Sequence, residues 1–171
     1  MNNFKKKNFS KKLQAWLISV DMGYGHQRAA YPLREIAYER IITANNDKLI
    51  SPEERKIWEK SRNFYEFISR AKTFPIIGNF LFSLFDKFQE ISPFFPFRDL
   101  SKPNFYTILI KKQVLKKGLC KSLIEYIKKK DLPLVSTYPV PAIAANYLGL
   151  KNIYCVVTDT DINRAWVVDN P

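Results

Sequence analysis

The sequence predicts an α/β protein in which a parallel sheet is flanked by helices, as in Rossmann-like domains. Three short apolar runs are typical of buried strands: AWLISV at 15–20, LPLVST at 132–137 and IYCVVTD at 153–159. Helical patterns separate these runs, and strands that alternate with helices form parallel sheets covered on both faces. With 171 residues, 46% of them hydrophobic, the chain is long enough to bury a core.

Two helices are expected between the first strand and residue 72. The first runs from about residue 27 to 44, because Leu33, Ile36 and Ile41 follow the spacing of an apolar helical stripe. The second begins at SPEE, residues 51–54, where a serine can cap the helix, a proline suits its first turn and a glutamate completes a capping box.

Residues 75–171 add an apolar segment, a long basic helix and a last short helix. Residues 75–88 are apolar on nearly every side, and a loop rich in Pro and Phe follows. A helix over about 105–130 carries eight lysines between residues 111 and 130. We expect it to turn the following side chains inward: Leu115, Leu119, Leu123, Ile124 and Ile127. The last helix, about 141–148, ends at Gly149, as a helix C-terminus favours.

The charge of the chain is strongly positive and unevenly distributed. The net charge is +12, and residues 131–171 contain four acidic and two basic side chains, so residues 1–130 carry +14. Residues 1–14 form a basic arm, and residues 15–171 form the folded domain. Such a basic body attracts phosphates of nucleic acids, anionic lipids or phosphorylated ligands, although a solvated lysine-rich surface would look the same.

Neither a metal site nor a membrane span is apparent. Cys120 and Cys155 form no close motif and are expected to be buried thiols in a reducing compartment, and the chain has one histidine. Residues 132–150 lack charge, but their three prolines and several polar residues argue against a spanning helix.

The stretch SVDMGYGHQRAA, residues 19–30, is the strongest candidate for a functional site. Gly23 and Gly25 let the backbone approach a ligand at the carboxyl edge of the sheet, and the imidazole of His26 can take a proton from a hydroxyl. A tight strand–helix turn explains the same residues without function. A dinucleotide loop would need a small third residue where this chain has Arg28, although Asp47 follows at about the right distance.

This stretch resembles the first-strand loop of the monogalactosyldiacylglycerol synthase and processive diacylglycerol glucosyltransferase family, whose members carry Asp-x-Gly-Gly-Gly-His. FYEFISRAKTFPIIGNFLFSLFDK is similar to the aromatic region of that family, and LPLVSTYPVPAIAANYLGLKNIYCVVTDTDINRAW resembles its strand, loop, helix and Thr-Asp…Trp motif. In this chain Tyr24 replaces the middle glycine, and Tyr138 and Asn163 replace histidines of the family pattern.

The resemblance implies the N-terminal half of a two-domain glycosyltransferase of the GT-B fold. It implies His26 as the general base, loop glycines at Gly23 and Gly25, and Thr158, Asp159 and Trp166 as the Thr-Asp…Trp motif. The substrate-binding residues expected on this basis are Gly23, Tyr24, Gly25, Tyr138, Asp159 and Trp166. The residues expected to meet the membrane and the lipid acceptor are Phe80, Phe82, Phe85, Phe94 and Phe95, although such an apolar segment could equally be core.

The resemblance therefore predicts the acceptor side of an enzyme that moves a hexose from a nucleotide sugar, a UDP-hexose, to a diacylglycerol-type lipid. It places the protein at the cytoplasmic face of a membrane with an anionic surface. The nucleotide sugar would be held by a C-terminal donor domain that we expect to be absent from this chain, and no cofactor or metal is expected within it. The alternative is a non-catalytic basic module that binds membranes or nucleic acid. Nucleic acid is the less favoured partner, because the aromatic residues lie in predicted helices and loops instead of strands.

Overall fold

The computed structural model describes residues 13–71, 80, 83, 84, 87, 105–159 and 166. Four strands within them form a single sheet in which every pairing is parallel, which confirms the predicted α/β class. The order across the sheet is β2 (Ala37–Thr43), β1 (Ala15–Ser19), β3 (Leu134–Ser136) and β4 (Ile153–Cys155). The strands expected over 132–137 and 153–159 are therefore present but shorter than expected.

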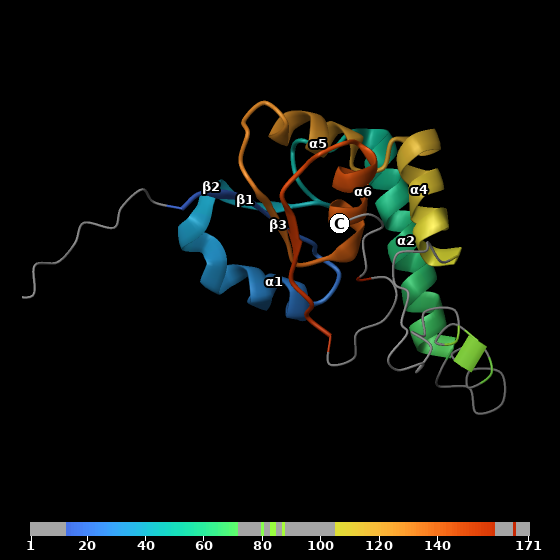
Figure 1. Cartoon of the computed structure of the whole chain (residues 1–171). Helices are drawn as coiled ribbons and strands as arrows, with labels where there is room; N and C mark the ends of the chain where they lie inside the picture. The colour runs from blue at the N-terminus through green and yellow to red at the C-terminus, as the bar shows by residue number, and fades with distance from the viewer. Residues whose placement is uncertain are drawn as a thin grey trace, which may run out of the picture.

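Helices cover both faces of this sheet. The helix α1 (Tyr24–Ala30) and the 3₁₀ helix η1 (Tyr31–Ile36) connect β1 to β2 on one face. Figure 1 shows the remaining helices on the opposite side of the sheet, with α2 and α4 toward one end of the molecule. These helices are α2 (Pro52–Ala71), α4 (Phe105–Lys117), α5 (Lys121–Ile127) and α6 (Pro139–Tyr147).

The central strand β1 organises the core. All five of its residues are buried, as expected for a parallel strand with helices on both faces. Trp16, Ile18 and Val20 point to the same face because side chains alternate along a strand, and they join one apolar cluster with residues of α2, α4, α5 and α6. The larger core therefore lies on the side of the sheet opposite α1.

The prediction of a helix over residues 27–44 is wrong for its second half. Helical structure ends at Ile36, and residues 37–43 form β2, whose Ile41 and Ile42 pair with Leu17 and Ile18 of β1. These residues include Tyr38, two isoleucines and a threonine, which fit a pleated strand well. Pairing with β1 outweighs the apolar spacing that suggested a helix, because that spacing is only a local signal.

The basic helix expected over residues 105–130 is two helices. Gly118 and Cys120 adopt positive φ angles of 72° and 61°, which end α4 and turn the chain before α5. Leu119, Leu123, Ile124 and Ile127 are buried as predicted, but Leu115 is 56% exposed. The break reorients α5 relative to α4, so one apolar stripe cannot continue through both helices.

The predicted helix ends are confirmed at α2 and α6. The backbone N–H of Glu54 donates to the Ser51 hydroxyl at 3.2 Å, whereas the Glu54 carboxylate accepts a 2.9 Å bond from the Ser122 N–H of α5 instead of closing a capping box. Gly149 follows α6 with a φ of 78°. In the part of the chain that the structure covers, no helix is long and apolar enough to cross a bilayer.

Candidate functional site

The loops that follow β1, β3 and β4 meet at the carboxyl edge of the sheet. From β1 the chain passes to β2 on one side, and β3 lies on the other side, so the strand order reverses at β1 and β3. Open parallel sheets bind ligands in the crevice outside such a reversal. His26, near the start of α1, lies at this position and contacts the loops after β3 and β4.

The imidazole of His26 is held through its Nδ1 atom. This nitrogen lies 2.9 Å from the backbone oxygen of Thr137 and 2.8 Å from the hydroxyl oxygen of Thr158. A carbonyl oxygen can only accept, so the arrangement favours a proton on Nδ1 that is directed to Thr137, with the Thr158 hydroxyl oxygen as a second acceptor. The neutral ring then has an unprotonated Nε2, which can accept a proton from a substrate hydroxyl.

Thr137 also fixes the backbone of the histidine. Its side-chain hydroxyl donates to the carbonyl oxygen of His26 at 2.9 Å and lies 3.2 Å from the hydroxyl oxygen of Ser19. Thr137 and Ser19 are fully buried, so water does not compete for these bonds. The ends of β1 and β3 thus position both the main chain and the side chain of His26.

Two aromatic residues form a wall beside the imidazole. The ring of Tyr138 meets the ring of His26 edge-on, with centroids 4.9 Å apart, and the ring of Trp166 lies 6.1 Å away. The indole N–H of Trp166 donates to the carboxylate of Asp159 at 2.7 Å, while its ring is buried. The structure therefore brings together four residues expected at the site: His26, Tyr138, Asp159 and Trp166.

Tyr106 forms a side-chain hydrogen bond with Tyr138. Burial raises the pKa of Tyr106 to about 12, against the opposing effect of its hydrogen bond with Tyr138. Tyr106 therefore remains protonated at neutral pH. It acts as a hydrogen-bonding partner for Tyr138 and not as a second proton acceptor.

The glycine loop contributes shape more than contacts. Gly23 has φ 112° and ψ 148°, a conformation open almost only to glycine, whereas Gly25 is helical. Tyr24 between them is 80% exposed. The described residues contain no ring contact between Tyr24 and His26, so the structure places Tyr24 at the same edge without bringing it to the imidazole.

Asp47, the acidic residue that a dinucleotide-binding site would need, is held by other residues. Arg40 binds both carboxylate oxygens of Asp47, and the Leu49 N–H donates to one of them at 3.0 Å. Burial alone would raise the pKa of Asp47, but the hydrogen bonds from Arg40 and Leu49 outweigh it, so the pKa lies below its ordinary value. This carboxylate is occupied in closing the turn after β2 and is not presented to a ribose.

The thiols offer no competing nucleophile. Burial raises the pKa of Cys155 to about 12 and that of Cys120 well above its ordinary value. Both therefore remain thiols at neutral pH, and the thiolate is the reactive form of cysteine. The described residues also contain no group of three or more side chains suited to hold a metal ion.

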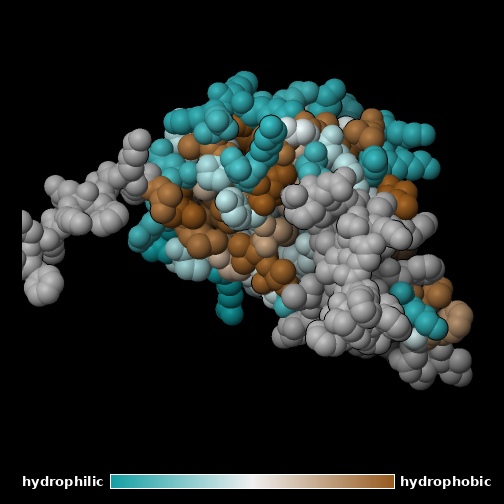
Figure 2. All heavy atoms as spheres, viewed as in Figure 1, coloured by the Kyte–Doolittle hydropathy of each residue, from teal (hydrophilic) through white to brown (hydrophobic). Residues whose placement is uncertain are grey.

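Of the expected membrane residues, the structure describes Phe80, which is 69% exposed; Phe82, Phe85, Phe94 and Phe95 lie outside the described residues. Other large apolar side chains are exposed on α2 and α4: Phe64, Phe67, Ile108, Leu109 and Leu115. Figure 2 shows hydrophilic side chains gathered along the edge of the molecule that α5 and the neighbouring end of α4 form. The exposed apolar side chains thus lie on α2 and α4, and the hydrophilic side chains line the edge at α5 and the adjoining end of α4.

Sequence reasoning missed the partners that hold the imidazole. Thr158 was expected as part of a motif, but its contact with His26 and the roles of Thr137 and Ser19 were not expected. Each of these residues lies at or just after the end of a strand. This position could have indicated that they lie at the site, because ligands bind at the carboxyl ends of parallel strands. No protein-family model, no curated protein and no solved structure matches this chain.

Proposed function

We propose that this chain is the acceptor side of a lipid glycosyltransferase that moves a hexose from a nucleotide sugar to the hydroxyl of a diacylglycerol-type acceptor. The observation that carries the proposal is the contact of His26 Nδ1 with the Thr137 carbonyl and the Thr158 hydroxyl. This contact leaves Nε2 as the basic atom at the switch point of the sheet.

In the proposed reaction, His26 acts as the general base. Its Nε2 takes the proton of the acceptor hydroxyl while the hydroxyl oxygen attacks the anomeric carbon of the sugar. The bond from that carbon to the diphosphate breaks, and the nucleotide leaves with the electron pair. The Thr137 carbonyl, which accepts from Nδ1, stabilises the imidazolium that forms. Such proton removal contributes about 10²- to 10⁴-fold in rate.

The remaining parts of the site fit roles around this base. Tyr138 and Trp166 flank the imidazole and would limit the approach of an acceptor to one side of the ring. Gly23 gives the loop its conformation, and both glycines would lie near the diphosphate of the donor. The donor itself would be bound by a C-terminal domain of the GT-B fold, joined to this one, as in the family that the sequence resembles.

The acceptor would reach this site from a membrane surface. The proposed contact region combines the exposed Phe64, Phe67 and Phe80 with the four exposed lysines of α4, Lys111, Lys112, Lys116 and Lys117. Apolar side chains enter the lipid interface, and each lysine near an anionic leaflet adds about 1 kcal/mol. This supports a peripheral location at the cytoplasmic face of the membrane.

The test is transfer of a hexose by this domain joined to a nucleotide-sugar-binding domain. We expect His26→Ala to lower kcat by about a hundredfold or more in a protein that remains folded, because the chain has no second imidazole. Glu35→Ala, an exposed change on η1, is the matched control and should leave kcat unaltered. Near-normal turnover by His26→Ala would overturn the assignment of the base.

The second candidate is a non-catalytic module that binds anionic membranes. The exposed apolar and basic groups of α2 and α4 favour it, and they do not depend on His26. Membrane binding that is retained in a protein whose transfer activity is absent with every nucleotide sugar would favour this candidate over the enzyme.

A further inference from the structure

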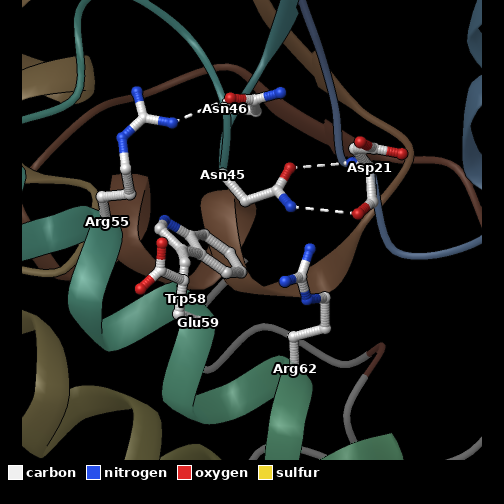
Figure 3. A pocket seen from close by; sticks show the side chains of 7 residues that line it. All are labelled: Asp21, Asn45, Asn46, Arg55, Trp58, Glu59 and Arg62. Carbon is white, nitrogen blue, oxygen red and sulfur yellow. Dashed lines mark hydrogen bonds between the residues drawn. The ribbon is translucent and has the colours of Figure 1, made fainter.

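A polar pocket of about 120 Å³ is lined by Asp21, which follows β1, and by residues after β2 and on α2. It opens where β1 and β2 end, and one face of α2 forms its far wall, as Figure 3 shows. Residues 55, 58, 59 and 62 of α2 share this face because they follow the helical spacing. The lining residues are Asp21, Asn45, Asn46, Arg55, Trp58, Glu59 and Arg62.

The loops after the two strands give the pocket a fixed wall. Asn45 accepts from the N–H of Asp21 at 2.8 Å and donates to its carbonyl oxygen at 3.0 Å. Arg55 donates to the side-chain oxygen of Asn46 at 2.8 Å. Gln27 donates to one carboxylate oxygen of Asp21 at 2.8 Å, and the other oxygen makes no hydrogen bond with a residue that the structure describes. Asp21, Asn45, Asn46 and Arg55 are thus held in place before a ligand enters, whereas Glu59 and Arg62 are exposed side chains of α2.

Trp58 supplies a donor that has no acceptor. Its side chain is 3% exposed, and its Nε1 atom is buried with no hydrogen-bond partner among the described residues. In Figure 3 this nitrogen is on the edge of the indole that points toward Arg55 and Asn46. An indole N–H can only donate, and a buried donor without a partner is unfavourable. A ligand oxygen that reached it would remove this cost.

The charges of the pocket alternate and balance. Along α2, Arg55 is followed by Glu59 and then by Arg62, and Asp21 lines the pocket from the loop after β1. Glu59 makes no hydrogen bond or ion pair with any residue that the structure describes, and Arg62 is 3.8 Å from Glu66 through its Nε atom. The pocket has two cationic and two anionic lining residues. It therefore favours neither an anionic nor a cationic ligand, since either kind of ligand would meet two side chains of its own charge.

We propose that this pocket binds a neutral polyhydroxyl group of glycerol to hexose size. Each hydroxyl both donates and accepts, so neighbouring hydroxyls can donate to Glu59 or Asp21 while they accept from Arg62 or from the indole N–H of Trp58. Tyr138 lies between this pocket and the histidine, because its ring is 6.3 Å from that of Trp58 and 4.9 Å from that of His26. The pocket is a second site, and its occupancy does not depend on glycosyl transfer.

The test follows the indole N–H signal of Trp58 in the nitrogen-15-labelled 171-residue chain. The three tryptophans give three such signals, and Trp58→Phe identifies the one that belongs to Trp58. We expect addition of glycerol or glucose to move this signal downfield in a saturable way, because the N–H gains an acceptor. A stronger response to glucose indicates a sugar as the natural ligand, and a stronger response to glycerol indicates the glycerol end of a lipid.

Variants of the two side chains with unused polar groups test the site itself. Glu59→Gln and Arg62→Gln should each weaken binding by about tenfold. Lys60→Gln, an exposed change elsewhere on α2, should leave binding unchanged. A Trp58 signal that neither glucose nor glycerol moves would overturn the proposal. A larger response to inorganic phosphate or to glycine would also overturn it, because it would show a site for an anion or a zwitterion.

Discussion

The hydroxyl oxygen of Thr158 lies 2.8 Å from Nδ1 of His26, although 132 residues separate them in the chain. This contact joins the end of β4 to the start of α1 across the carboxyl edge of the sheet. Together with the Thr137 carbonyl, it determines which ring nitrogen of His26 carries the proton. Catalysis by this histidine as a base requires the proton to be on Nδ1, because Nε2 is then free to accept a proton.

We predict that neutral His26 carries its proton on Nδ1. The chain has a single histidine, so a long-range proton–nitrogen NMR spectrum contains one imidazole and needs no assignment by mutation. Thr158→Val, which removes the second acceptor, should increase exchange between the two tautomers, whereas Thr158→Ser should preserve the parent spectrum. A proton found mainly on Nε2 in the parent protein would contradict the arrangement described above.

The two loop glycines should respond differently to alanine. Gly23→Ala should lower the free energy of unfolding by about 1–3 kcal/mol, because a Cβ at φ 112° is strained even where space is free. Gly25→Ala should be neutral or should stabilise by up to about 1 kcal/mol, because Gly25 is helical with no atom within 4 Å of an added Cβ. Urea unfolding measures both, and equal effects would contradict the loop conformation.

The ion pair of Arg40 and Asp47 should make stability depend on acid pH. The pKa of Asp47 is lower in the folded protein than in the unfolded chain, so the pair stabilises the fold fully above about pH 4. This stabilisation is lost as the pH falls through the lower, folded value. Asp47→Asn should therefore cost about 1–3 kcal/mol at pH 7, and its difference from the parent should shrink below about pH 4.

Urea unfolding over a series of pH values measures this difference. The control is Glu125→Gln, which breaks the exposed pair with Lys121 and should change stability by no more than about 1 kcal/mol. A difference between Asp47→Asn and the parent that stays constant from pH 7 to acid pH would contradict the role given to Asp47.

Membrane binding should have a part that salt removes and a part that it does not. Flotation with anionic liposomes should carry the protein, and high salt should release part of it, because screening weakens the attraction of the α4 lysines. The double change Phe64→Ser and Phe67→Ser should reduce the salt-resistant part, since apolar burial is not screened. Tyr31→Ser, at an exposed aromatic position on η1, is the control. If the protein floats with neither anionic nor neutral liposomes, the proposed membrane contact is wrong.

This chain alone should bind nucleotide sugars weakly. The glycine loop offers little more than backbone groups to a diphosphate, and the carboxylate of Asp47, the acidic candidate for a ribose at the end of β2, is held by Arg40 and Leu49. We expect a Kd no lower than about 1 mM, or roughly −4 kcal/mol, by calorimetry with UDP-glucose and UDP-galactose. A micromolar Kd for either would place the donor site in this domain and overturn its assignment to the acceptor side.

The strand runs, the cap at Ser51 and the helix end at Gly149 were determined by the sequence itself. Each depends on residues close together in the chain, such as a serine whose hydroxyl meets an N–H three residues later. The α/β class followed from the same local patterns, and the histidine loop was identified from its composition and its place after a strand.

Tertiary structure alone decided the rest. Residues 37–43 became β2 because they pair with β1, and no local pattern records that partner. The Nδ1 contacts of His26 come from loops more than 100 residues away, and the buried indole of Trp58 shares its pocket with the ends of two strands. The periodicity of the sequence indicates which face of a segment is apolar. The contacts named above depend instead on how distant segments meet, and the packing of the helices on the sheet determines how they meet.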